Sequence, residues 1–357
     1  MAMKFIVACG GTGGHSFPGL AVARELKDRG HNVTVWMSGR NIESSVLKSW
    51  DGDVFFTGMR QLSLKNVFRI LLSLWKCKRE IVRAKPDALL AMGSYSSLPP
   101  VLAAYSSKVP VVLHEANTVP GKAVSFLSRF AKTVATSFDI TKNFLPDRET
   151  VKTGLPVRAG IGDGKRFEEI PEGSFVLFVT GGSQGAHRVN ELVSSACVIV
   201  KKTLDKKESE TPFFVIHQTG AADEKTVKDK YAHANVKCRV NAFEYEMADA
   251  FESANLVVAR AGASTCFELA AAGKPAFFIP LPSALRDHQH VNALAFVQNG
   301  AADEGIQDKL TPEVIADFIL YRIEHPSILE EKAEKMKAMS IPDAAGKVAD
   351  ILEGIGK

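Results

Sequence analysis

Two glycine-rich segments, one in each half of the chain, constrain the fold more than any other feature. Each directly follows a short apolar run: residues 4–9 precede Gly10–His15, and residues 175–179 precede Thr180–Ala186. A strand that ends in glycines and opens a helix brings backbone N–H groups to a helix N-terminus, where anionic groups are favoured. The repetition predicts two Rossmann-like domains with parallel sheets facing a central cleft, and at least one segment that binds phosphate. Such an arrangement suits an enzyme that handles a nucleotide-activated substrate.

Elsewhere, short β-branched and aromatic runs alternate with helix-like stretches in both halves. This alternation is typical of parallel sheets covered by helices on both faces, and a length of 357 residues favours two domains. The polar, glycine-rich stretch 159–173 indicates a linker. We therefore expect a first domain over residues 1–160, a second over 161–342, and a C-terminal helix at about 343–357 that packs back on the first domain.

The expected elements follow from the same alternation. Strands are predicted at 4–9, 32–37, 53–56, 87–91, 110–113 and 133–136, and then at 174–179, 213–217, 236–240, 255–259 and 276–279. Helices are predicted at 17–29, 41–49, 66–84, 95–106 and 120–130, and then at 185–201, 223–231, 246–252, 264–272, 287–298 and beyond 312.

The composition disfavours several classes of protein. The five cysteines are scattered and contain no C-x-x-C pair, so we expect free thiols in a reducing compartment rather than disulfides or zinc ligands. Residues 1–4 lead directly into the first strand, and no apolar run reaches about 18 residues, so we expect neither a signal peptide nor a membrane span. The net charge of +4 permits acidic ligands or a membrane surface without requiring either, and we expect no nucleic-acid partner.

The first glycine-rich segment is not a dinucleotide-binding fingerprint. Ser16 occupies the position of the third glycine, and the strand at 33–37 ends without the carboxylate that would bind a ribose. An NAD-dependent oxidoreductase is therefore disfavoured. His15, at the mouth of the loop, is a candidate base. A turn that only lets helix and sheet pack closely remains the alternative.

The second segment is the better phosphate site. Gly181–Gly185 offers backbone donors, a hydroxyl and the start of a helix. Further along, the small residues of 260–268 admit a ligand close to the backbone, and Ser264 or Thr265 can cap the helix there. Glu268, about one turn inside, could accept both ribose hydroxyls. The alternative is a glutamate favoured near a helix N-terminus by the dipole alone.

Three further features concern phosphate and metal binding. Arg158 lies at the expected interdomain junction, where a cation could reach a diphosphate. Asp51 and Asp53 form a D-x-D pattern, but they precede a short strand at a turn, on the wrong end of the sheet for a ligand. His288 and His290 have the spacing of a metal pair without a third distant ligand, so we expect no metal.

Residues 65–83 combine bulky apolar side chains with six basic ones and one acid. Such a helix could rest on an anionic membrane surface. It could also pack its apolar side on the sheet, and the apolar set is wide enough for both. The candidate membrane residues are Phe68, Leu71, Leu72 and Trp75, with the cations Arg69, Lys76 and Arg79.

Taken together, five motifs resemble, in order and spacing, the MurG family of glycosyltransferases, which is part of glycosyltransferase family 28. They are residues 10–15 with 17–21, His114-Glu115-x-Asn117, residues 181–186, residues 260–268 and Asp287-His288-Gln289. The match covers nearly the whole chain. The resemblance implies a GT-B fold and an inverting enzyme that moves N-acetylglucosamine from UDP-N-acetylglucosamine to the C4 hydroxyl of the muramoyl sugar of lipid I. The product is lipid II, for peptidoglycan synthesis.

The resemblance also implies site residues, with the acceptor in the first domain and the donor mainly in the second. Catalytic and acceptor-side positions are His15, Tyr95 and Glu115, with His15 the first candidate base and Glu115 the second. Donor-binding positions are Gly11, Thr12, Gly13, Asn117, Arg158, Ser183, Gln184, Glu244, Ala263, Ser264, Thr265, Cys266, Phe267, Glu268 and Gln289. Glu268 would bind the ribose, Ser183 and Arg158 the diphosphate, Gln289 the sugar hydroxyls, and the backbone of Glu244 the uracil.

No cofactor or metal is implied, because the second glycine loop, its helix dipole and Arg158 would stabilise the departing UDP. The expected location is peripheral, on the cytoplasmic face of the cytoplasmic membrane, with anionic lipids and other cell-wall synthesis proteins as partners. The sequence departs from the family pattern at Ser94, Ala116, Leu155 and 282–285, which puts fine sugar contacts in doubt. A transferase acting on another lipid, such as a diacylglycerol, and a non-catalytic nucleotide-sugar-binding subunit remain alternatives.

Overall fold

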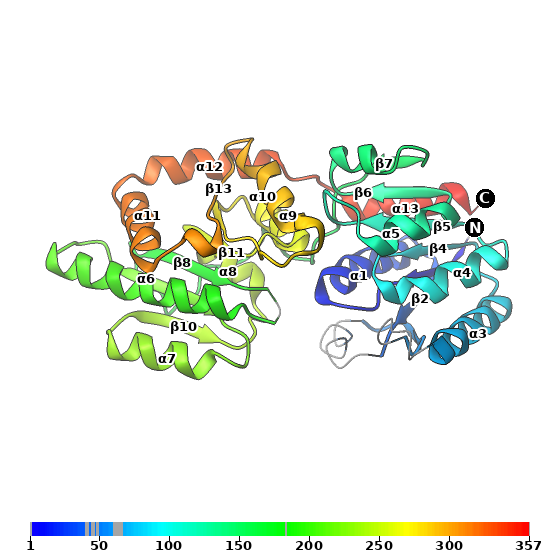
Figure 1. Cartoon of the computed structure of the whole chain (residues 1–357), viewed down its shortest axis with the longest axis horizontal. Coiled ribbons are helices and arrows are strands. Elements are labelled where there is room, and N and C mark those ends of the chain that lie inside the picture. Colours follow the sequence, from blue (N-terminus) through cyan, green and yellow to red (C-terminus); the bar gives the residue numbers. More distant parts are fainter. Residues whose placement is uncertain are drawn as a thin grey trace. The chain divides into compact units, whose positions relative to one another are not determined.

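The computed structural model describes residues 2–39, 43, 47, 50–59, 67–182 and 184–356. The chain divides into two compact units. Unit 1 comprises Met1–Ala159 and Ile341–Lys357, and unit 2 comprises Gly160–Ser340. Each unit is a parallel sheet with helices on its faces (Figure 1).

Unit 1 is built on a seven-stranded sheet in the order β3-β2-β1-β4-β5-β6-β7, with every neighbouring pair parallel. Its strands are β1 (Lys4–Ala8), β2 (Asn32–Met37), β3 (Asp53–Phe56), β4 (Ala88–Ala91), β5 (Val111–Glu115), β6 (Thr133–Thr136) and β7 (Thr150–Lys152). Its helices are α1 (Gly13–Asp28), α3 (Val67–Ala84), α4 (Leu98–Ser106), α5 (Lys122–Leu127) and α13 (Ala344–Ile355). Short 3₁₀ turns are η2 (Tyr95–Ser97), η3 (Ser128–Phe130) and η4 (Asp139–Phe144).

Unit 2 repeats this plan with a six-stranded parallel sheet in the order β10-β9-β8-β11-β12-β13. Its strands are β8 (Phe175–Thr180), β9 (Phe213–Gln218), β10 (Lys237–Asn241), β11 (Leu256–Ala259), β12 (Ala276–Phe278) and β13 (Ala302–Glu304). Its helices are α6 (His187–Lys206), α7 (Glu224–His233), α8 (Met247–Ser253), α9 (Ala263–Ala272), α10 (His288–Val297), α11 (Pro312–Glu324) and α12 (Pro326–Ala338), with η5 (Leu285–Asp287) and η6 (Gln307–Lys309) between them.

The predicted fold class of two Rossmann-like domains is confirmed. In each sheet the chain runs outward from a central first strand, turns back and continues on the other side, which is the doubly wound order. Two strands were missed, β7 and β13. Each has three residues and lies at a sheet edge, where a short pattern carries little apolar signal. The predicted helix at 41–49 lies mostly outside the described residues.

The core of unit 1 forms on both faces of β1, because alternate residues of a strand point to opposite sides. Phe5 and Val7 pack with α1 and α13, and Ile6 and Ala8 pack with α3 and α4. Helix α1 lies close against β1 at Gly19, where an added Cβ would come within 2.2 Å of the Cys9 Cβ. The helix begins at Gly13, earlier than predicted, so the last residues of the first glycine segment form its first turn.

Candidate active site

In unit 1, the carboxyl ends of β1, β4 and β5 bring three loops to one edge of the sheet. His15, in the first turn of α1, reaches the loop after β4, where its Nδ1 lies 2.7 Å from the carbonyl oxygen of Met92. A carbonyl only accepts, so Nδ1 carries the proton and Nε2 keeps a lone pair. Burial lowers the pKa of the imidazole, outweighing the hydrogen bond to Met92 that favours the cation. His15 is thus neutral at neutral pH and able to accept a proton.

Glu115, the second candidate base, is placed differently. Its buried carboxylate accepts hydrogen bonds from the backbone N–H of Asn117 (2.9 Å), the Asn117 side-chain amide (3.1 Å) and the backbone N–H of Gly121 (2.9 Å). Burial raises the pKa of this carboxyl group against those hydrogen bonds. Both oxygens are occupied in shaping the loop after β5. The geometry therefore supports a role for Glu115 in orienting Asn117, and His15 is the better placed base.

Glu43 is a site-forming residue that the sequence analysis missed. Its buried carboxylate accepts hydrogen bonds from the backbone N–H groups of Gly11 (2.8 Å), Ser38 (3.2 Å) and Gly39 (2.7 Å). The N–H of Gly11 consequently points to a side chain of the protein itself. Gly11 has φ +137°, a backbone conformation that favours glycine. Its backbone N–H already donates to the Glu43 carboxylate. No local pattern marks Glu43, because its partners follow two other strands.

The neighbouring loop after β4 explains one departure from the family pattern. The hydroxyl of Ser94 donates to the carbonyl of Gly10 at 2.8 Å and accepts from the N–H of Ser96 at 3.1 Å. Ser94 thereby ties this loop to the first glycine segment and caps η2. Tyr95, next in the chain, leaves 45% of its surface exposed and is available to a ligand.

The remaining unit 1 candidates lie around the start of α1. Thr12 is the exposed N-cap residue of α1, and Gly13 is the first residue of the helix. Arg158 does not extend freely, since its guanidinium stacks on the ring of Phe17 at 4.8 Å. Because Phe17 lies on α1 two residues after His15, the structure brings Arg158 next to the helix that carries the candidate base.

In unit 2, the second glycine loop packs tightly against the loop after β9. Gly185 has φ +75°, and an added Cβ would lie 2.0 Å from the carbonyl oxygen of Thr219. Gln218, which was not predicted, donates to the carbonyl of Gly182 at 2.8 Å. Gln184 is exposed at the tip of the turn, whereas Ser183 lies outside the described residues. The described part of the loop is therefore held in place by contacts with Gln218 and Thr219, while Gln184 faces solvent.

The loop after β10 is held by ionic contacts. The buried Glu244 carboxylate pairs with Arg239 at 3.1 Å and accepts from Asn241 at 2.9 Å. Burial alone would raise the pKa of Glu244, but these bonds and the N–H of Glu246 outweigh it and lower the pKa. The backbone N–H of Glu244 points to the Gln218 side chain at 3.4 Å. Gln218 thus links this segment to the glycine loop.

A buried arginine organises the loops that follow β11 and β12. Arg260 donates to the carbonyls of Ile279 (2.9 Å) and Pro280 (2.8 Å), which lie in the loop after β12. In the same region the Gln289 side chain accepts from the N–H of Leu281 at 3.0 Å, and Asn292 donates to the carbonyl of Ala261 at 3.1 Å. These side chains fix two neighbouring loops at the carboxyl edge of the sheet, and Gln289 does so from the first turn of α10.

Helix α9 corrects one sequence-based expectation. The N-cap is Gly262, and Ser264 and Thr265 lie inside the first turn, so neither caps the helix as predicted. The predicted donor-binding residues of α9 differ in how far they are buried. Ser264 and Thr265 are partly exposed, Ala263 and Glu268 are largely buried, and Cys266 and Phe267 pack in the interior. The ring of Phe267 packs against the ring of Phe296, and the Cys266 side chain is fully buried.

The D-x-D pattern lies away from these loops. Asp51 pairs with Lys27 at 2.7 Å on the surface, and Asp53 begins β3 at the opposite end of the strand from the loop edge. Among the described residues, no three side chains of histidine, cysteine, aspartate or glutamate gather closely enough to hold a metal ion.

Comparison with known proteins identifies the family. A UDP-N-acetylglucosamine–N-acetylmuramyl-(pentapeptide) pyrophosphoryl-undecaprenol N-acetylglucosamine transferase of Colwellia psychrerythraea is 34% identical, over 99% of this chain and 93% of its own. The Geobacter metallireducens enzyme of the same name is 35% identical, over 98% and 97%. Family models for the glycosyltransferase family 28 N-terminal and C-terminal domains match residues 5–136 and 176–348. The chain belongs to glycosyltransferase family 28.

Comparison with solved structures shows which member of family 28 this chain resembles. MurG of Acinetobacter baumannii is 31% identical, covers 99% of this chain and 100% of its own, and superposes with a TM-score of 0.77. The resemblance to MurG and the GT-B fold are thereby confirmed. A UDP-GlcNAc 2-epimerase of Neisseria meningitidis bound to UDP-GlcNAc, 16% identical with a TM-score of 0.71 and covering 99% of this chain and 100% of its own, shares the fold alone.

We expect His15 to titrate below the ordinary histidine value of about 6.5, because burial disfavours the imidazolium. Long-range ¹H–¹⁵N NMR of the ring nitrogens, with His15→Gln to assign the resonance, measures both the pKa and the tautomer. The same spectrum should show the proton on Nδ1. A pKa at or above the ordinary value, or a proton on Nε2, would contradict the geometry.

Proposed function

We propose that this family 28 chain transfers N-acetylglucosamine from UDP-N-acetylglucosamine to the C4 hydroxyl of the N-acetylmuramoyl sugar of lipid I, with inversion, to form lipid II. The names of relatives 34–35% identical over nearly their whole length support this reaction. The structural observation that carries it is the hydrogen bond of 2.7 Å between Nδ1 of His15 and the carbonyl of Met92, which leaves the Nε2 lone pair available.

The donor is assigned to unit 2. Its diphosphate would lie at the glycine loop after β8, where the amino end of α6 carries partial positive charge. Glu268 would accept the ribose hydroxyls, and Gln289 would contact the sugar. The backbone of Glu244 would contact the base. In support, Gln218, Arg260 and Asn292 hold the surrounding loops rigidly, and a preorganised site does not spend binding energy on ordering itself.

The acceptor is assigned to unit 1. Nε2 of His15 would remove the proton of the C4 hydroxyl as that oxygen attacks the anomeric carbon of the donor and the bond to UDP breaks. General-base help of this kind contributes roughly 10²–10⁴ in rate. Tyr95 would line the acceptor, Glu115 would keep the donor-binding Asn117 oriented, and Arg158 would offset charge developing on the departing diphosphate.

Helix α3 is proposed to rest on the cytoplasmic face of the membrane. The apolar side chains of its exposed face lie in solvent: Phe68 is 78% exposed, Trp75 57% and Leu71 58%. Cations flank them, and Arg79 lies over the Trp75 ring at 5.7 Å. An apolar face bordered by basic residues is the pattern of a helix that lies in the membrane interface. Among the described residues, no helix is both long and apolar enough to cross a bilayer.

The purified chain, given labelled UDP-N-acetylglucosamine, is expected to label lipid I, because donor loops and candidate base are present in one polypeptide. Diacylglycerol offered in the same vesicles should stay unlabelled. Transfer to diacylglycerol instead would indicate a different lipid glycosyltransferase. Nucleotide-sugar binding without turnover would indicate a non-catalytic subunit.

Replacing the base should affect the chemical step and not donor binding. His15→Ala is expected to lower kcat by about 10²–10⁴ while UDP affinity changes little. His325→Ala, which removes an exposed histidine of unit 2, is the matched control and should keep full activity. An unchanged kcat in His15→Ala would remove His15 as the base.

Membrane docking is tested on the exposed face of α3. The double variant Leu71→Ser and Trp75→Ser should lower partitioning onto anionic vesicles more than tenfold, since it removes two of the apolar side chains that would enter the interface. Flotation with vesicles measures it, and Val314→Ser, on the exposed surface of unit 2, is the control. Equal flotation of the double variant and the wild type would refute docking through α3.

A further inference from the structure

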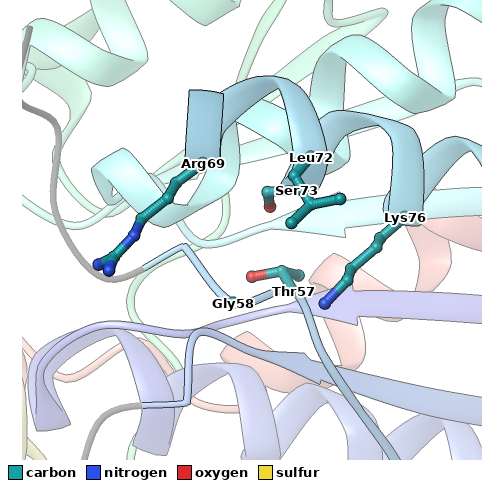
Figure 2. Close-up of a pocket in the computed structure, with 6 residues that line it drawn as sticks. All are labelled: Thr57, Gly58, Arg69, Leu72, Ser73 and Lys76. Carbon is teal, nitrogen blue, oxygen red and sulfur yellow. The ribbon is translucent and has the colours of Figure 1, made fainter. Parts of the chain in front are cut away.

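The segments that follow the strands of each sheet differ in how closely they are joined to their surroundings. In unit 1, a cavity of about 320 Å³ lies between α3 and the turn at Thr57 and Gly58, which follows β3 (Figure 2). In unit 2, the segments that follow β8, β9 and β10 are instead joined to one another by hydrogen bonds. The first and last of these carry the positions assigned above to the donor diphosphate and to the base. The way they are joined therefore bears on whether the two parts of a nucleotide bind independently.

Gln218, the last residue of β9, bonds to the segments on both sides of it, because β9 lies between β8 and β10 in the sheet. Its side chain donates from Nε2 to the carbonyl of Gly182 at 2.8 Å and accepts at Oε1 from the backbone N–H of Glu244 at 3.4 Å. A carbonyl only accepts and an N–H only donates, so these two partners fix the orientation of the amide. The residue is 1% exposed, which keeps water from competing for either bond. One amide group thus links the two segments.

The backbone that follows Gln218 also contacts both neighbouring segments. Thr219 and Gly220 donate their N–H groups to the carbonyls of residues 241–242, at 3.0 Å each. On the other side, an added Cβ at Gly220 would lie 2.3 Å from the carbonyl oxygen of Gln184, so the backbones are in close contact there. Gln218 differs from these backbone contacts because a single side chain bonds to both segments. Its contribution can therefore be removed by substitution while the backbone contacts remain.

We propose that Gln218 is a positioning residue that couples the base and diphosphate subsites, so that each part of UDP binds more tightly when the other is present. The proposal rests on the donor assignment made above and adds a free energy of coupling between its two subsites, which by linkage acts equally in both directions. A fragment that orders one segment gains from the link only as far as the other segment is ordered too. UDP orders both segments and gains the full contribution of the two hydrogen bonds, about tenfold in affinity.

The test compares UDP with its two fragments, uridine and pyrophosphate, on the full chain. Gln218→Met removes both hydrogen bonds and keeps the length of the side chain. We expect this variant to bind UDP about tenfold more weakly and each fragment at most about twofold more weakly, measured by calorimetry for UDP and by NMR titration for the fragments. An equal loss for UDP and one of the fragments would show that Gln218 serves a single subsite. That result, or unchanged affinity for all three ligands, overturns the proposal.

Asn255→Ala is the matched control for the loss of a structural hydrogen bond in the same unit. The Asn255 side chain accepts from the N–H of Val176 at 2.8 Å and so joins the same sheet near the amino ends of β8 and β11, away from the donor segments. This variant should unfold at a lower temperature and bind UDP as the wild type does, because the donor segments keep their contacts. If Asn255→Ala weakens UDP binding as much as Gln218→Met does, the effect is one of stability and the proposal is overturned.

Backbone amide chemical shifts report the coupling directly. In the wild type, pyrophosphate alone should shift the N–H resonance of Glu244, and uridine alone should shift that of Gly182, because each fragment orders the distant segment through Gln218. In Gln218→Met, each fragment should shift only the segment that it contacts. A residue that served stability alone would not change which amides respond. Distant shifts that persist in the variant would assign the coupling to the backbone of residues 219–220 and remove Gln218 as the link.

Failure of this proposal is distinguishable from failure of the proposed function. If the wild type binds UDP and Gln218→Met weakens UDP and a fragment equally, the donor assignment stands and the coupling falls. If the coupling is observed but the chain does not label lipid I, the coupling stands and the proposed transfer falls. If the wild type does not bind UDP, the donor assignment falls and the coupling falls with it.

Discussion

The parallel pairing of β1 with β2 on one side and β4 on the other determines where the candidate groups of unit 1 lie. Because all three strands run the same way, the segments that follow them leave the sheet at one edge. The hydrogen bond from His15 to Met92 spans two of these segments. Because α1 packs closely against the end of β1 at Gly19, His15 in the first turn of α1 is held near the carboxyl ends of these strands. Unit 2 uses the same strand order to gather its glycine loop with Gln218 and Arg260.

Buried polar side chains then fix the conformations of the loops that leave each sheet. Glu43 and Glu115 each accept backbone N–H groups that a loop would otherwise leave unpaired, and Arg260 donates to carbonyls for the same reason. Unpaired backbone groups in a buried loop cost free energy, so each of these side chains selects one loop conformation.

Much of the fold followed from local pattern. Apolar runs and glycines predicted the central strands and both phosphate-type loops, and the motif order predicted the family. The failures have physical causes. Strands β7 and β13 are too short to show a pattern, and Gly262 takes the N-cap of α9 because the helix starts one residue earlier than its first hydroxyl. Cys266 belongs to a matching motif, yet its side chain faces the interior.

Local chemistry therefore specified the two glycine loops, the helices behind them and the reactive residue types. Long-range folding decided which of those residues can act. The sequence offers His15 as the first candidate base and Glu115 as the second, but only the fold pairs one with a carbonyl that leaves a free lone pair and surrounds the other with N–H donors. Glu43 and Gln218 carry no local signal, because their partners lie on segments that meet only in the folded sheet.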